Sequence, residues 1–141
     1  MANKKTKKAT KTKKPAVAAR LKEKRFVNEG RIYINATFNN TIVTITDLEG
    51  NVVDWVSSGK LGFKGTRKST PFAAISTVEE GVGKAVSRGL KRAELFIKGP
   101  GPGREAALKV LRGKREIDIA TISDITPIAH NGPRPPKMRR G

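Results

Sequence analysis

The stretch RIYINATFNNTIVTITD, residues 31–47, decides which kind of fold this chain adopts. Apolar side chains recur at every second position of its first half, the period of a strand with one buried face. We expect the inward residues to be Ile32, Ile34, Ala36 and Phe38. Asn39-Asn40 is a turn signal, because asparagine tolerates left-handed backbone angles. The β-branched run Thr41–Asp47 then predicts a second strand, and the short link favours antiparallel pairing.

A third strand and a helix are predicted next. VVDWVSS, Val52–Ser58, is strand-like and follows a turn at residues 48–51, so it extends the antiparallel meander. Thr70 and Pro71 indicate a helix start, since a threonine hydroxyl caps the first turn and proline suits the first helical position. Gly89 is a suitable stop for this helix. The three- and four-residue spacing of its apolar residues predicts an inward stripe of Phe72, Ile75, Val78, Val82 and Val86.

The second half of the chain alternates strands with one more helix. Ala93–Gly99 is short and apolar, which predicts a buried strand, and Glu116–Thr126 predicts a further strand. Between them, Arg104–Arg112 predicts a helix that turns three apolar residues inward: Ala107, Leu108 and Leu111. Gly81 and Gly83 in the first helix each cost about 1 kcal/mol relative to alanine, and close packing on a sheet would explain them.

The order of elements is β-β-β-α-β-α-β, which predicts an α/β domain with a mixed, five-stranded sheet. Its β-α-β crossovers are expected to be right-handed and to pack both helices against the sheet, in two or three layers. The order resembles that of ribonuclease H-like proteins, which is an analogy of order alone.

Positive charge is concentrated at the two ends of the chain. Of the net charge of +18, residues 1–25 contribute +10 and residues 132–141 contribute +4, whereas residues 26–131 hold fifteen bases and eleven acids. Such arms repel themselves and do not collapse into a core, but they suit a polyanion through counterion release. Nucleic acid is therefore the leading partner. An anionic membrane fits less well, because the arms lack an amphipathic face.

Composition also excludes several classes of protein. The sequence has no apolar run long enough for a membrane span, no signal peptide and no cysteine for disulfides or thiolate metal sites. We expect no cofactor, no metal site and no small-molecule substrate. We divide the chain into a basic disordered arm (1–27), an α/β RNA-binding domain (28–127) and a basic, proline-rich, extended C-terminal arm (128–141).

The loop KGPGPGRE, Lys98–Glu105, lies between a predicted strand and a predicted helix, where α/β sheets bind ligands. The helix N-terminus offers free N–H groups, glycines let a phosphate approach, and prolines fix the loop before binding. It is neither a Walker loop nor a dinucleotide fingerprint, so a nucleic-acid phosphate fits better than a mononucleotide. The alternative is a stiff structural turn. The predicted contact residues are Lys98, Gly99, Gly101, Gly103 and Arg104.

A second glycine-rich loop, Gly59–Thr70, also precedes a helix N-terminus and contains no acid. Its cations are predicted to contact phosphates, which positions a protein without reading sequence: Lys60, Lys64, Arg67 and Lys68. Phe63 either stacks on a base or anchors the loop in the core. The C-terminal arm is expected to thread between RNA helices, with a solvated tail as the alternative. Its predicted contacts are Asn131, Arg134, Lys137, Arg139 and Arg140.

Two other functions stay open from the residues alone. A nuclease-like enzyme needs carboxylates gathered on a metal, and the sequence does not show that its four candidates converge: Asp47, Asp54, Asp118 and Asp124. We therefore expect no catalysis. A general architectural binder would instead take duplex DNA and ribosomal RNA equally well.

Four longer motifs resemble the bacterial-type small-subunit ribosomal protein S-eleven family. They are FNNTIVTITD (38–47), GFKGTRKSTPFAA (62–74), KGPGPGRE (98–105) and DITPIAHNGPRPPK (124–137). The resemblance runs from about residue 30 to residue 140 and leaves out the N-terminal arm. Pro133 stands where bacterial relatives usually have a cysteine, a change that keeps the arm extended.

The resemblance implies a structural constituent of the small ribosomal subunit, without catalytic activity, that serves translation. Members bridge helices of the small-subunit ribosomal RNA on the platform, and their C-terminal arm lies near the cleft that holds messenger RNA and its Shine–Dalgarno pairing. Implied neighbours are the small-subunit proteins numbered seven and eighteen, and contact with initiation factor three is associated with the family. The implied location is the ribosome, in a bacterial cytoplasm or alternatively a plastid stroma.

Overall fold

A computed structural model of the chain describes residues 26–138. Residues 1–25, which make up nearly all of the predicted N-terminal arm, lie outside this range, as do Arg139 and Arg140. The elements follow the predicted order, with one added 3-10 helix, η1: β1 (Glu29–Ala36), β2 (Thr41–Thr46), β3 (Val52–Ser57), η1 (Gly65–Ser69), α1 (Pro71–Ser87), β4 (Arg92–Lys98), α2 (Gly103–Gly113) and β5 (Asp118–Asp124).

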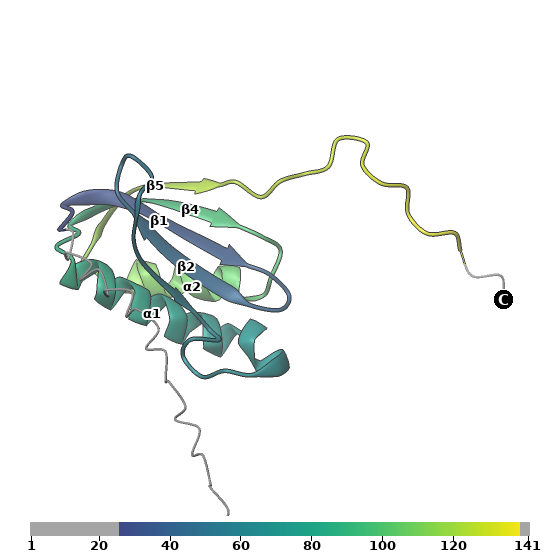
Figure 1. Cartoon of the computed structure of the whole chain (residues 1–141), viewed down its shortest axis with the longest axis horizontal. Coiled ribbons are helices and arrows are strands. Elements are labelled where there is room, and N and C mark those ends of the chain that lie inside the picture. Colours follow the sequence, from purple (N-terminus) through teal and green to yellow (C-terminus); the bar gives the residue numbers. More distant parts are fainter. Residues whose placement is uncertain (1–25, 139–141) are drawn as a thin grey trace, which may run out of the picture.

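The five strands form one mixed sheet in the order β3-β2-β1-β4-β5. β1, β2 and β3 pair in antiparallel fashion, as the short links predict, whereas β4 pairs in parallel with both β1 and β5. Both helices lie on the same face of the sheet, which gives two layers (Figure 1). The predicted α/β class and five-stranded sheet are confirmed. Neither helix of the described part is long and apolar enough to cross a membrane.

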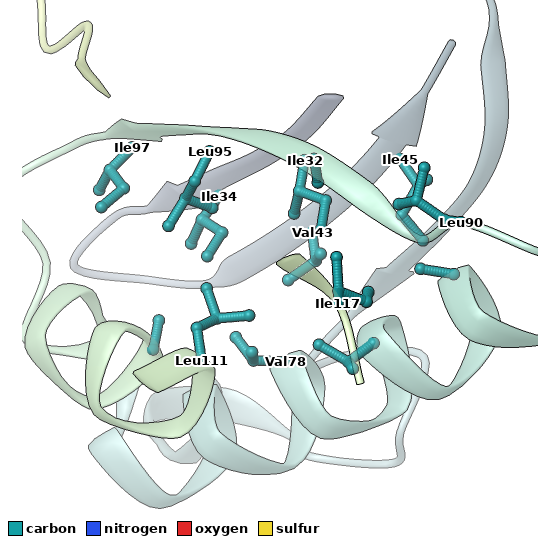
Figure 2. Close-up of a cluster of buried hydrophobic side chains, with 14 residues drawn as sticks. Ile32, Ile34, Val43, Ile45, Val78, Leu90, Leu95, Ile97, Leu111 and Ile117 are labelled. Carbon is teal, nitrogen blue, oxygen red and sulfur yellow. The ribbon is translucent and has the colours of Figure 1, made fainter. Parts of the chain in front are cut away.

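The hydrophobic core fills the space between the sheet and the two helices. Strand residues at alternate positions point toward the helices, and Val78 and Leu111 of the helices point toward the sheet (Figure 2). Val82 of α1 belongs to the same cluster. The strand residues of this cluster include Ile32, Ile34, Val43, Ile45, Leu95 and Ile97. The period-two pattern of the first strand is therefore confirmed for its first three inward residues.

The prediction that Phe38 continues this buried face was wrong. β1 ends at Ala36, and Phe38 lies in the following turn with 69% of its surface exposed. The hydroxyl of Thr37 accepts from the backbone N–H of Asn40 at 3.0 Å, and the Thr37 N–H donates to the Asn40 carbonyl at 2.9 Å. These bonds close the hairpin two residues early, which turns Phe38 out of the strand.

The start and stop of α1 are as predicted, but its buried face is not. Thr70 accepts a capping bond from the N–H of Ala73, and Gly89 follows the helix with φ of +83°. Two members of the predicted stripe, Phe72 and Val86, are 68% and 39% exposed. The buried residues are mostly small: Ala73, Ala74, Thr77, Val78, Gly81, Val82 and Ala85.

Small residues bury because α1 approaches the sheet closely. A Cβ atom on Gly81 would lie 3.0 Å from Cγ1 of Val43. The hydroxyl of Thr77 donates to the Ala73 carbonyl at 2.6 Å and lies 3.0 Å from the Ser58 hydroxyl, so its polar atom has partners in the core. At this separation larger side chains do not fit beneath the helix, and they lie at its flanks. The close packing expected of Gly81 is confirmed.

Gly83 differs from Gly81, because a Cβ atom there would meet nothing within 4 Å. We predict that Gly83→Ala raises the free energy of unfolding by about 0.5–1 kcal/mol, through helix propensity alone. Gly81→Ala gains the same propensity but presses on Val43, so it should be the less stable variant. Urea denaturation of both variants and the parent measures this, and equal midpoints for the two would contradict the packing argument.

Candidate nucleic-acid interface

The loop between β4 and α2 is packed tightly against the turn between β1 and β2. Gly99 has φ of +102°, and a Cβ atom on it would overlap the carbonyl oxygen of Ala36. A Cβ atom on Gly101 would overlap the carbonyl oxygen of Thr37, and one on Gly103 would lie 2.8 Å from Cβ of Ala74. Glycine is required at these positions because other atoms of the fold already occupy the space.

Several N–H groups of this loop already have protein acceptors. Gly101 donates to the Ala36 carbonyl at 2.9 Å, and Gly99 donates to the hydroxyl of Thr126 at 3.1 Å. Arg104 donates its backbone N–H to the Gly101 carbonyl at 3.2 Å. The alternative of a stiff structural turn thus accounts for the three glycines. Contact of this loop with RNA stays a prediction, for which the exposed Lys98 offers the free charge.

Arg104 joins the start of α2 to the end of β5. Its guanidinium forms an ion pair with the carboxylate of Asp124 and donates to the hydroxyl of Thr126 at 3.3 Å. The same carboxylate accepts from the N–H of Thr126 at 2.9 Å and from its hydroxyl at 2.6 Å. Because Thr126 also accepts from Gly99, one cluster connects the loop, α2 and the last strand. We call Gly99, Arg104, Asp124 and Thr126 the latch.

The C-terminal arm leaves the domain directly after the latch. Ile125 donates its N–H to the Ile97 carbonyl at 2.9 Å, the last of the backbone bonds that tie the described chain to β4. From Pro127 to Met138 the arm forms no helix or strand and all twelve residues are exposed. Asn131 on this arm has φ of +51°, a left-handed angle that asparagine tolerates. Figure 1 shows the arm running away from the sheet, and it carries Arg134 and Lys137 into solvent.

The second predicted contact segment, residues 59–70, wraps around the N-terminal end of α1. Lys64 and Arg67 are exposed, and Lys68 is half-buried. Lys60 reaches in another direction: its ammonium lies 4.6 Å from the ring centroid of Trp55 and donates to the Trp55 carbonyl at 3.3 Å. The loop therefore offers at least two unobstructed cations.

Phe63 in this loop does not anchor it in the central core, because it is half-buried and lies outside that cluster. Stacking of its ring on a base stays a prediction. The rings of Phe63 and Phe72 form a T-shaped pair, with 6.1 Å between the centroids and 79° between the planes.

Strand register gathers the three predicted contact segments at one end of the sheet. On β2, Ile42 pairs with Ser57 of β3 on one side and with Asn35 of β1 on the other. Asn35 in turn lies opposite Lys98 of β4, and β4 runs parallel to β5. The loop after β3, the loop after β4 and the arm after β5 thus all leave the sheet at its same end, although they are far apart in the sequence.

Comparison with known proteins shows the family of this chain. The family model for ribosomal protein S11 matches residues 30–140. The chain belongs to this family. A relative from Treponema pallidum (strain Nichols) is 55% identical over 125 residues, which cover 89% of this chain and 98% of the relative. A relative from Desulfotalea psychrophila (strain LSv54 / DSM 12343) is 54% identical with the same coverage, and both are named small ribosomal subunit protein uS11.

Family membership makes this protein a structural component of the small ribosomal subunit and not an enzyme. Of the four carboxylates considered for catalysis, two form ion pairs within the domain. Asp54 pairs with Arg88 at 3.1 Å and Asp124 with Arg104, whereas Asp118 begins the strand that Asp124 ends. No three metal-ligating side chains gather within residues 26–138.

Hydrogen bonds also keep two of these carboxylates charged. The Asn51 side chain is the main cause of the lowered pKa of Asp47. Burial raises the pKa of Asp54, but bonds from the Trp55 N–H and from Arg88 outweigh it and leave that pKa below its ordinary value. Both groups therefore serve as anionic partners inside the domain and not as proton donors.

Sequence reasoning found Arg104 but missed its partner. Asp124 lies twenty residues further along the chain, and only strand pairing brings it to the start of α2. A usable signal was the sequence Asp-Ile-Thr after the last strand, because aspartate and threonine at this spacing commonly bond each other's backbone and side chain in turns.

The latch predicts that the stability of the folded domain decreases at low pH. Arg104, followed by the bonds from Thr126, lowers the pKa of Asp124 below its ordinary value. Its stabilising contribution is therefore complete above the unfolded-state value of about 3.9 and is lost as the pH falls below that value toward the folded pKa. We expect Asp124→Asn to lower the urea midpoint at pH 7, and the gap from the parent to narrow below about pH 4.

Asp118→Asn is the matched control for this measurement, since it removes an exposed carboxylate at the opposite end of the same strand. The difference in urea midpoint between Asp118→Asn and the parent should not follow the pH dependence seen for Asp124→Asn. A gap for Asp124→Asn that stays constant from pH 7 to about pH 3 would show that the ion pair contributes nothing.

Proposed function

We propose that this ribosomal protein bridges helices of the small-subunit ribosomal RNA on the platform of the subunit. The observation that carries the proposal is the register of the sheet, which brings two cationic loops and a cationic arm to one end of the domain. Three separate segments of positive charge at one rigid end suit several phosphate backbones at once. The described residues proposed to face RNA are Lys60, Lys64, Arg67, Lys68, Lys98, Gly99, Gly101, Gly103, Asn131, Arg134 and Lys137.

Arg104 belongs to the same predicted set, but its guanidinium already has two partners in the protein. We therefore propose that it serves RNA binding by holding the base of the arm and not by meeting a phosphate. Arg139 and Arg140, beyond the described residues, complete the proposed set at the tip of the arm.

The finer placement rests on the family resemblance. We propose that the arm contributes to the cleft that holds messenger RNA and its Shine–Dalgarno pairing, close to small-subunit proteins seven and eighteen and to initiation factor three. The twelve described residues of the arm would reach about 35–40 Å if fully extended in polyproline fashion, which suffices to cross an RNA helix. The relatives come from bacteria, so we propose a bacterial cytoplasmic ribosome; a plastid ribosome is the other candidate.

Sedimentation in a salt series tests the central proposal. The native protein should migrate with small subunits from cell lysate at low salt and still do so at about 1 M salt, where simple phosphate attraction is screened. Loss at high salt would mean that the protein is held only electrostatically at the periphery. Absence from the subunits even at low salt would contradict the proposal altogether.

The loop after β3 gives a sharper prediction. Lys64→Ala with Arg67→Ala should weaken binding to a platform-domain fragment of small-subunit RNA and flatten the plot of log affinity against log salt by about 0.7–0.9 per lost phosphate contact. Lys91→Ala with Arg92→Ala removes the same charges from the opposite end of the sheet and should leave the slope unchanged. Equal slopes for the two pairs would place the RNA elsewhere, and equal affinity for duplex DNA would favour a general architectural binder.

A further inference from the structure

A shallow groove runs between the loop after β3 and the outward face of α1. We call it the α1 groove, and its lining residues are Leu61, Phe63, Phe72, Ser76, Glu79 and Glu80. It lies away from the core, on a helix face that neither the sheet nor α2 covers within the described residues. None of the cations predicted to contact RNA lines it.

One end of the α1 groove is an aromatic surface that the fold does not use. Phe72 is 68% exposed, and the ring of Phe63 packs against it in a T-shaped arrangement. The sequence pattern predicts Phe72 in the core, yet Ala73 and Ala74 occupy that place because the helix lies so close to the sheet. Two aromatic rings side by side in one open groove, unlike an apolar side chain exposed alone, are typical of a protein interface, where aromatic anchors contribute most of the binding energy.

The other end of the α1 groove is acidic. Glu79 and Glu80 are neighbours on α1 and both are exposed. The carboxylate of Glu80 forms an ion pair with the ammonium of Lys84, with 3.3 Å between the oxygen and the nitrogen. Glu79 has no ion pair among the described residues. In a chain of net charge +18 this spot repels phosphate and attracts a cation. Its charge is complementary to a basic peptide and opposed to an RNA backbone.

We propose that the α1 groove docks a segment of another small-subunit protein. The segment places an apolar side chain on Phe63 and Phe72, and a lysine or arginine against Glu79 and Glu80. Along α1, about seven or eight residues separate the two ends of the groove, or about 11–12 Å. An extended peptide covers this distance in about three or four residues, at about 3.3 Å each. Successive side chains of an extended peptide point to opposite faces, so the apolar and basic side chains of the partner are about four positions apart.

This proposal goes beyond RNA binding, because it assigns a face of the domain to a protein partner. It depends on the protein's place in the small subunit and not on any of the proposed RNA contacts. If the proposed RNA contacts were disproved, the docking proposal would still hold. If the docking proposal were disproved, the proposed RNA contacts would be unaffected.

Site-specific photo-crosslinking in assembled subunits tests it. A benzoylphenylalanine replaces Ser76, at the middle of the groove, in the full-length chain, and purified small subunits containing that chain are irradiated. Mass spectrometry should find a crosslink to a peptide of another small-subunit protein, with a lysine or arginine about four positions from an apolar residue. A crosslink to RNA, to residues 1–25 of this chain or to a second copy, or no crosslink at all, would overturn the proposal.

Charge reversal makes the test specific. Glu79→Lys with Glu80→Lys should lower the crosslink yield about tenfold, because the groove then repels a basic segment. Phe72→Ser should lower the yield as well, through loss of the aromatic anchor. An unchanged yield with either variant would overturn the proposed recognition.

The matched control is Glu49→Lys with Glu116→Lys, which makes the same change in net charge at exposed positions outside the groove. It should leave the crosslink yield as in the parent, and an equal loss in this control would reduce the effect to overall charge and overturn the proposal. The substituted side chains are exposed except for that of Ser76, which is half-buried, and thermal unfolding of each free variant confirms that it folds before subunits are assembled.

Discussion

The close approach of the loop after β4 to the end of the first hairpin is the constraint on which this domain depends. Backbone lies against backbone there, with Gly99 and Gly101 seated on the carbonyl oxygens of Ala36 and Thr37. The contact sets where β4 ends, where α2 begins and where Thr126 is held by the Gly99 N–H. Since the arm starts directly after Thr126, the direction in which this ribosomal protein extends into its surroundings follows from a contact between backbones, which no side chain can replace.

Charge is used in two ways in the same molecule. Inside the domain, acids hold cations in place: Asp54 pairs with Arg88, and Asp124 with Arg104. Outside it, the two arms hold most of the net positive charge and the loops at one end of the sheet add exposed lysines and an arginine, whereas Glu79 and Glu80 stand together on the outer face of α1. The domain thus separates a cationic end from an acidic helix face, and the two suit partners of different chemistry.

Most of the fold was predictable because its signals are local. Alternation found β1, the Thr70-Pro71 pair found the start of α1, and Gly89 found its end. The errors arose where tertiary packing overrides periodicity. Apolar spacing suggested Phe72 and Val86 for the core, but the helix lies so close to the sheet that small residues fill the contact instead. Spacing reports which side chains are apolar and not how near the facing sheet stands.

The sequence by itself determined the kinds and order of the elements, the cationic ends and the motifs that mark the family, because each of these is written in neighbouring residues. The tertiary structure alone decided which distant segments meet. Strand pairing placed three contact segments at one end of the sheet and brought Asp124 to Arg104. It also gave the loop glycines their role, since the carbonyl oxygens that exclude a Cβ atom belong to a hairpin far earlier in the chain. Pairing between remote strands is a property of the whole packed chain, and no local pattern specifies it.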